Sequence, residues 1–263
     1  MIDDFKSEFI CGRKFQTIAN RIWDTDRKDD PKTFQDGEII WCKTDFVLSL
    51  FHQISDHKNK YKLITHNSDF PITQSMFKLR PKCITKWYAE NANYKNIDLI
   101  PLPLGLENDM GPSKGAYTNY EAIERNLNAA DKNEDKVYCN FTMKNNPCRI
   151  KVVNALIKNK VILWEDRKDY HAYCNSMSKY RFVASPIGNG LDCHRTWEAL
   201  YMGCIPIVEK HFMYDMLGNL PIIQVSDWGE VTSEWLEDTL QMFKKSRYDW
   251  NYLKIAYWTE RIK

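Results

Sequence analysis

The 263-residue chain has no apolar run that approaches the roughly 20 residues needed to span a bilayer, so membrane insertion is not expected. Its first residues, MIDDFKSEFICGRK, include acids and lack an apolar core, which predicts the absence of a secretory signal. No basic tract is interleaved with aromatic residues, and 37 basic against 35 acidic residues give a net charge of only +2. A nucleic-acid partner is therefore not expected.

The eight cysteines form no C-x-x-C pair, and this spacing excludes zinc-ribbon and thioredoxin-type sites. Without a secretory route, we expect free thiols in a reducing compartment, and hence a cytoplasmic protein. The sequence also has no internal repeat and no low-complexity tract. It does have enough apolar residues, 43% of the chain, to bury a sizeable core.

Short apolar runs alternate with segments of helical length through most of the chain. This alternation predicts βαβ units, parallel sheets and an α/β fold. The expected strands are 38–43, 61–66, 97–102, 136–141, 161–165, 181–185, 204–209 and 221–225. The expected helices are 119–130, 147–158, 168–178, 192–202, 233–245 and 246–263.

A polar segment without an expected strand, from about residue 107 to 135, divides the chain into two α/β halves. We therefore expect an N-terminal domain over 1–118 and a C-terminal domain over 119–245. The aromatic-rich helix expected over 246–263 should pack back onto the first domain.

A glycine loop stands between a buried strand and a helix in the stretch SPIGNGLDCHRTWEAL, residues 185–200. The loop 188–190 is able to adopt positive φ, and Asp192 is a good N-cap for the helix. The free N–H groups and the dipole at such a helix start favour an anion such as phosphate. A dinucleotide fingerprint needs a third glycine where Cys193 stands, so the loop disfavours an NAD site.

Three polar side chains follow on one face of the expected helix, because His194, Arg195 and Glu198 are spaced three and four residues apart. A guanidinium at Arg195 is able to bind a diphosphate bidentately. A carboxylate at Glu198, one turn further, is able to accept both hydroxyls of a ribose. From the spacing alone, a surface ion pair on an ordinary amphipathic helix is the equal alternative.

The segment RFVASPIGNGLDCHRTWEALYMGCIPIV, residues 181–208, strongly resembles the donor-site segment of exostosin-like glycosyltransferases. The resemblance extends more weakly to residues 63–72, 87–108 and 137–149. It implies the GT-B architecture, with two Rossmann-like halves, parallel sheets and a cleft between them. The chain looks most like the compact soluble forms of large DNA viruses and microbes, which implies the host cytoplasm if the protein is viral.

The same resemblance implies an inverting transferase that uses a nucleoside diphosphate sugar, most simply a UDP-sugar such as UDP-xylose. The acceptor would be an oligosaccharide or glycoprotein, and the protein a monomer. The residues implied to bind the donor are Arg149, Ser185, Gly188, Asn189, Gly190, Asp192, His194, Arg195 and Glu198. Two alternatives stay open: a GDP-fucose-type transferase on a similar scaffold, and a nucleotide-sugar-binding protein without turnover.

Inverting transfer requires a base that takes the proton of the acceptor hydroxyl. The best candidate loop is THNSDFP, residues 65–71, because it follows an expected strand and offers two groups. We expect Asp69 to be the base, with His66 as the second candidate. Asp45 and Glu107 are further alternatives, since each follows another expected strand.

Neither a metal ion nor another cofactor is expected. GT-A transferases hold a divalent ion with a D-x-D motif, and Asp24-Thr25-Asp26 has these letters but precedes every expected strand. GT-B enzymes need no ion, because helix dipoles and arginines stabilise the leaving diphosphate.

Overall fold

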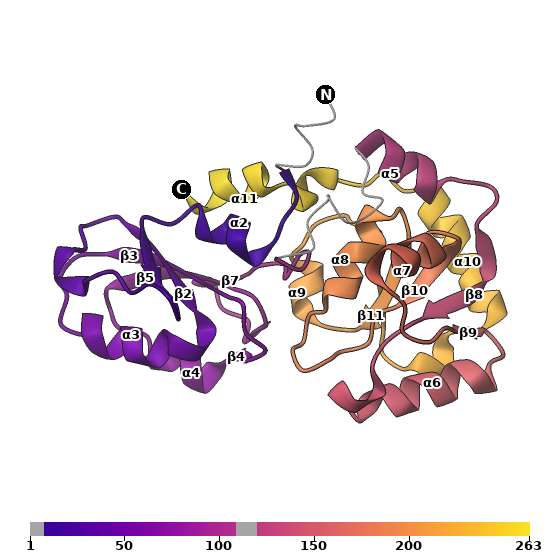
Figure 1. Cartoon of the computed structure of the whole chain (residues 1–263), viewed down its shortest axis with the longest axis horizontal. Helices are drawn as coiled ribbons and strands as arrows, with labels where there is room; N and C mark the ends of the chain where they lie inside the picture. Colours follow the sequence, from indigo (N-terminus) through magenta and orange to yellow (C-terminus); the bar gives the residue numbers. More distant parts are fainter. Residues whose placement is uncertain (1–7, 109–119) are drawn as a thin grey trace. The chain divides into compact units, whose positions relative to one another are not determined.

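A computed structural model describes residues 8–108 and 120–263, so the expected domain boundary after residue 118 lies outside the described residues. The described chain divides into two compact units. Unit 2 comprises residues 8–104, 190–192 and 251–263; the remaining described residues, 105–108, 120–189 and 193–250, form unit 1. Each unit has a five-stranded parallel sheet with helices packed on it (Figure 1), which confirms the expected α/β class.

The sheet of unit 2 has the strand order β1-β2-β3-β5-β7. Its strands are β1 (Arg21–Trp23), β2 (Ile39–Lys43), β3 (Tyr61–His66), β5 (Ile84–Ala89) and β7 (Leu99–Pro101), with a small second sheet of β4 (Ile72–Thr73) and β6 (Ala92–Asn93). Since this order never reverses, right-handed crossovers place all the connections on one face. In Figure 1 that face carries α3 (Val47–Ile54) and α4 (Gln74–Lys78), and the other carries α2 (Gly12–Gln16) and α11 (Ile255–Ile262).

The sheet of unit 1 has the order β12-β11-β10-β8-β9, which reverses between β8 and β10. Its strands are β8 (Asn133–Cys139), β9 (Ile162–Trp164), β10 (Tyr180–Ala184), β11 (Ile205–Glu209) and β12 (Ile223–Val225). Its helices are α5 (Tyr120–Leu127), α6 (Cys148–Lys158), α7 (Tyr170–Met177), α8 (His194–Tyr201), α9 (Phe212–Asp215) and α10 (Ser233–Lys244). Because the order reverses, right-handed crossovers place α6 on one face and α7, α8 and α9 on the other.

Each unit has its own apolar core. In unit 2, α3 buries Leu50, Phe51 and Ile54 at helical spacing. The ring of Phe51 meets Trp87 of β5 edge-on, with the centroids 5.3 Å apart. The corresponding cluster of unit 1 includes Tyr138 of β8 and Val183 of β10, which are partners in the parallel register.

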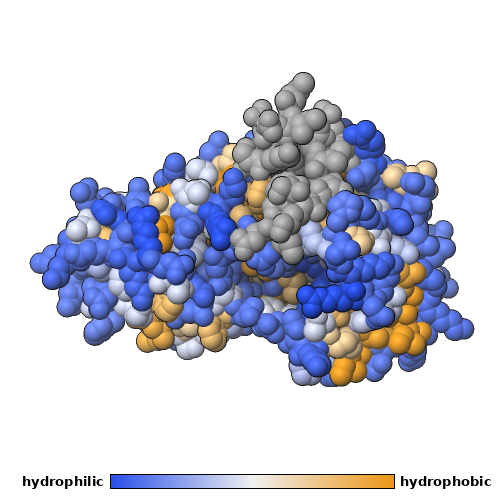
Figure 2. Space-filling model, in the orientation of Figure 1, coloured by the Kyte–Doolittle hydropathy of each residue, from blue (hydrophilic) through white to orange (hydrophobic). Residues whose placement is uncertain are grey.

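The surface drawn in Figure 2 is mostly hydrophilic, with hydrophobic side chains gathered at the lower right, where α6 lies. On that helix Ile150 and Ile157 are exposed. Among residues 8–108 and 120–263, no helix combines the length and the apolar composition that crossing a membrane requires. The cysteines, all within these ranges, are free thiols.

Every expected strand corresponds to a strand of the structure, but β1, β5 and the two-residue strands β4 and β6 were not expected. Strand β1 has only three residues. Strand β5 includes Thr85, which is exposed, and Lys86, so it lacks a continuous apolar run. The prediction of one helix over 246–263 is wrong. The segment forms a 3-10 turn (Trp250–Leu253) and α11, separated by the extended Lys254, which forms an antiparallel bridge with Phe9.

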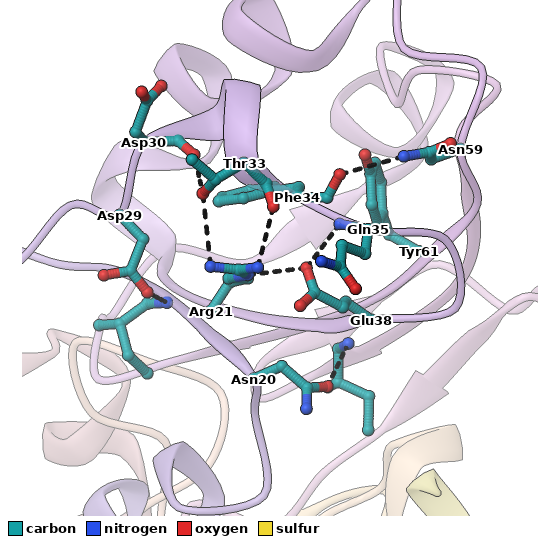
Figure 3. A network of polar contacts seen from close by, with 12 residues as sticks. Asn20, Arg21, Asp29, Asp30, Thr33, Phe34, Gln35, Glu38, Asn59 and Tyr61 are labelled. Carbon is teal, nitrogen blue, oxygen red and sulfur yellow. Dashed lines mark hydrogen bonds and ion pairs between the residues drawn. The ribbon is translucent and has the colours of Figure 1, made fainter.

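A polar network at the amino ends of β1 and β2 fixes the connection between these strands, residues 24–37 (Figure 3). The Nε atom of Arg21 donates to Oε2 of Glu38 over 2.7 Å, and its Nη2 donates to the carbonyl oxygen of Thr33 over 2.9 Å. Its guanidinium also lies 5.4 Å from the ring centroid of Phe34. One side chain thus holds residues 24–37 against the sheet.

Replacing Arg21 with alanine should make the connection between β1 and β2 more mobile. We expect hydrogen exchange of the amides in residues 24–37 to rise by about tenfold, because two bonds to a largely shielded guanidinium are lost. Arg27→Ala is the matched control, since Arg27 pairs with Asp29 at the exposed surface. Equal exchange in both variants would show that Arg21 does not hold the segment.

Candidate functional site

The reversal of strand order in unit 1 marks where a ligand is expected. In open α/β sheets, ligands bind outside the carboxyl ends of the strands at such a point. Residues 140–146 follow β8, and residues 185–189 follow β10 within the same unit. The first turn of α8 comes next in the chain. Arg149, Ser185, Gly188, Asn189, His194, Arg195 and Glu198 are therefore brought to one edge of one sheet.

Arg149 lies beneath these loops and is only 3% exposed. Its Nε donates to the carbonyl oxygen of Ile187 over 2.9 Å, and its Nη1 donates to that of Thr142 over 2.8 Å. A third contact joins its Nη2 to the carbonyl oxygen of Pro186 at 3.3 Å. Burial lowers the pKa of Arg149. The guanidinium therefore holds the two loops together, and its donors are taken up by the protein, although the resemblance implies that Arg149 binds the donor.

The glycine of this loop is required by close packing. A Cβ atom at Gly188 would lie 2.9 Å from Nη2 of Arg149. The positive φ expected for the glycines at 188 and 190 is wrong, since the glycines with positive φ lie elsewhere. Asn146 further fixes the loop, because its Nδ2 donates to the carbonyl oxygen of Gly188 over 2.9 Å. The exposed Asn189 forms the tip.

Two further polar residues hold the same loop from β10 and β11. The hydroxyl of Ser185 is buried and lies 2.9 Å from the hydroxyl of Thr196 in α8, so it joins strand to helix. At the end of β11, Oε2 of Glu209 accepts from the backbone N–H of Ile187 over 3.0 Å. Its Oε1 accepts from Nε1 of Trp228 over 2.9 Å. Ser185 and Glu209 thus position the loop.

Arg195 faces the carboxyl end of β8. Its Nε donates to the carbonyl oxygen of Asn140 over 3.1 Å. Its guanidinium lies 5.3 Å from the ring centroid of Phe141, and that of Arg149 lies at the same distance from this ring. Within the described part of the chain, the terminal amino groups of Arg195 have no protein partner. They are the guanidinium donors of this edge that are available to an anion.

Glu198 is buried one turn along α8 and is 8% exposed. Its Oε2 accepts from the hydroxyl of Tyr173 in α7 over 2.9 Å. Burial raises the pKa of Glu198, although the charges of Arg195 and His194 oppose this rise. One carboxylate oxygen is thus fixed by the protein and the other is left for a donor from outside, which suits recognition of a hydroxyl.

His194 adds a positive charge to the start of α8. Its Nδ1 lies 2.7 Å from the carbonyl oxygen of Gly105, and its Nε2 lies 3.2 Å from Oε2 of Glu107. Burial by itself would lower the pKa of His194, but these hydrogen bonds and the charge of Glu107 raise it to about 9. The imidazole is therefore protonated at neutral pH.

Two expected donor residues, Gly190 and Asp192, belong to unit 2 and contact Asn91 there. A Cβ atom at Gly190 would lie 2.8 Å from Nδ2 of Asn91. The expected N-cap role of Asp192 is wrong, because the N-cap of α8 is Cys193. The carboxylate of Asp192 instead accepts from the backbone N–H of Leu104 over 2.9 Å, so both residues anchor this segment.

His66 is fully buried at the end of β3. Its Nδ1 lies 2.7 Å from Oε2 of Glu90, and its Nε2 lies 3.1 Å from the carbonyl oxygen of Pro103. Burial would lower the pKa of His66, but the charge of Glu90 raises it. The ring of Phe15 stacks on it with the centroids 5.3 Å apart. With no exposed atom, this placement does not fit direct proton transfer to a substrate.

The other expected acids of unit 2 are at the surface. Asp69 is exposed in the loop after β3, and Asp45 is exposed 3.9 Å from Nζ of Lys43. Asp24 follows β1, which corrects the expectation that it precedes every strand, and its Oδ2 accepts from Gln16 over 3.3 Å. Glu107, the remaining alternative base, lies in unit 1 and pairs with His194.

Sequence reasoning missed several residues that build these sites. Each of these residues contacts a residue of the site that is distant in the sequence: Tyr173, Glu209, Phe141 and Glu90. Phe141 and Glu209 had a local signal, because each is the last residue of an expected strand. In the ranges 8–108 and 120–263, no three His, Cys, Asp or Glu side chains are grouped as metal ligands.

Compared with models of known protein families and with curated proteins, the chain matches none of them.

The His194 contacts predict how stability depends on pH. The folded-state pKa of about 9 lies above the ordinary 6.5, so the stabilisation is complete below pH 6.5 and is lost as pH rises through about 9. The free energy of unfolding of the parent, measured with urea, should therefore fall over this interval. His194→Ala and Glu107→Gln should each flatten that dependence, whereas His52→Ala, which removes an exposed histidine of α3, should not. An unchanged slope in His194→Ala would contradict the ion pair.

Proposed function

We propose that the protein is an inverting glycosyltransferase that moves a sugar from a nucleoside diphosphate sugar, most simply a UDP-sugar, to a glycan hydroxyl. One observation carries the proposal. At the reversal of strand order in unit 1, α8 presents a guanidinium with free donors and a buried carboxylate with one free oxygen. These are the two groups that a diphosphate and a ribose require.

The proposal gives each group a separate role. Glu198 accepts the ribose hydroxyls through the oxygen that Tyr173 leaves free. Arg195 and the N–H groups at the start of α8 bind the diphosphate. The protonated His194 and the buried Arg149 add positive potential without contacting the ligand.

The proposal extends to the GT-B division of labour, in which unit 1 binds the donor and unit 2 supplies the base. The acceptor oxygen attacks the anomeric carbon while the bond from that carbon to the diphosphate breaks. Asp69, exposed and without a protein partner in the described chain, takes the proton of the acceptor hydroxyl. Arg195 stabilises the charge that develops on the leaving diphosphate. No metal ion is assigned to the reaction.

Glu198→Gln tests the ribose role. The amide keeps the shape but replaces the charged acceptor, so we expect UDP to bind about tenfold more weakly by calorimetry. UDP binding to the parent should also weaken as pH falls through the raised pKa of Glu198, because the ionised carboxylate is the acceptor. Glu237→Gln, at an exposed position of α10, is the charge-matched control.

Two results would count against the donor site. Equal UDP affinity in Glu198→Gln and the parent would remove the ribose role. Tighter binding of GDP than of UDP by the parent would redirect the proposal to a GDP-sugar donor.

Asp69→Asn tests the base. We expect it to retain UDP binding and to lower sugar transfer by about 10²–10⁴-fold, the usual effect of losing a general base. Asp45→Asn, at another exposed acid of the same unit, should transfer normally. If Asp45→Asn loses transfer and Asp69→Asn does not, the base is Asp45. UDP binding without any transfer in the parent would leave a nucleotide-sugar-binding protein.

A further inference from the structure

The loop that follows β3, residues 67–71, is held in one conformation by hydrogen bonds to the end of β5. The backbone N–H of Ser68 donates to Oε1 of Glu90 over 2.5 Å. The carbonyl oxygen of Ser68 accepts from Nδ2 of Asn91 over 2.9 Å. The loop enters through Asn67 at a φ of 61°, a left-handed conformation that is uncommon outside glycine. Its path is therefore set by fixed partners.

The partners of the loop are themselves buried. Glu90 has no exposed surface, and its Oε2 has only the charge of His66, 2.7 Å away, as compensation. Asn91 is 2% exposed and also adopts positive φ. Burying a charged pair is costly. Here one member of the pair, Glu90, also holds the backbone of an exposed loop in place.

The tip of the loop carries two bare side chains. Phe70 is 58% exposed and Asp69 beside it is exposed. Neither side chain makes a hydrogen bond, ion pair or ring contact within residues 8–108 and 120–263. The other large hydrophobic residues exposed in unit 2 are aliphatic: Leu48, Leu79 and Ile97. An aromatic ring and a carboxylate thus stand at consecutive, exposed positions of this loop.

This pair matches the two kinds of surface on a sugar ring. The C–H face of a pyranose carries partial positive charge and suits the negative face of an aromatic ring. The hydroxyls at its rim donate to a carboxylate in charge-assisted bonds. An anionic lipid surface would be repelled by Asp69. An organic cation also suits a ring beside a carboxylate, and it is therefore the competing ligand.

We propose that the loop 67–71 binds the acceptor saccharide, with Phe70 stacked on a sugar ring and Asp69 accepting a hydroxyl of that ring. This site deepens the proposed function, on which its acceptor role rests, and it makes the acceptor a pyranose with an accessible C–H face. The binding itself needs neither a nucleotide nor turnover.

Saturation-transfer NMR with simple glycosides and no nucleotide tests the site. The probes are methyl β-xylopyranoside, methyl β-galactopyranoside and methyl α-mannopyranoside, with choline as the cationic competitor. We expect at least one glycoside to receive saturation from the parent protein. Phe70→Ala should weaken that binding by about fivefold, and Phe70→Tyr should retain it. Leu79→Ala is the control for an exposed apolar residue of the same unit.

Three outcomes would overturn the proposal: no glycoside binds the parent, Phe70→Ala binds as the parent does, or choline binds in preference to every glycoside. Circular dichroism of each variant establishes that it is folded. These results are independent of UDP binding to unit 1. Glycoside binding without UDP binding would refute the donor site alone, and UDP binding without glycoside binding would refute this site alone.

Discussion

The buried guanidinium of Arg149 sets the shape of the edge of unit 1 where the candidate site lies. A buried charge is tolerated only when its donors are satisfied, and here carbonyl groups from both loops meet it. Those carbonyls must turn inward, and position 188 must be glycine for the guanidinium to fit. The arginine stays charged, because its group does not deprotonate in proteins. It therefore contributes positive potential while serving as a structural support.

The strand order differs between the two units and decides which faces of each sheet the connections cover. In unit 1 the order reverses between β8 and β10, the position at which open α/β sheets bind ligands. In unit 2 the order runs in one direction, so connections use only one face, and the other is closed by α2 and α11. A Cβ atom at Gly12 of α2 would collide with Asn67 and crowd His66. Unit 2 thus buries His66 at the end of β3 and Glu90 after β5, and it exposes Asp69 and Phe70 on the loop beyond β3.

The sequence was informative where structure leaves a local mark. Parallel strands buried on both faces are almost continuously apolar, which is why β2, β3, β10 and β11 were predicted. The loop before α8 was predicted because its glycines are a local signal in the sequence. The reason for a glycine at position 188 was not predicted, because it is the close packing against Arg149, which is far away in the chain. Tyr173 is 25 residues from Glu198, and no spacing rule joins them. The sequence therefore predicted which loops lie at this edge of unit 1, but not the contacts that Arg149, Gly188 and Asp192 make.

The two histidine–glutamate pairs differ in burial, which decides how far solvent and ligands can reach their charges. His66 and Glu90 have no exposed surface, so solvent and ligands have little access to their charges. His194 and Glu107 are 34% and 46% exposed, so their charges are accessible to solvent. An anion bound at the start of that helix would favour the protonated form of His194. By linkage, the protonated form must then favour the anion to the same extent. The histidine, whose pKa is already raised to about 9, is thus held in the charged form that an anion at this helix start would favour.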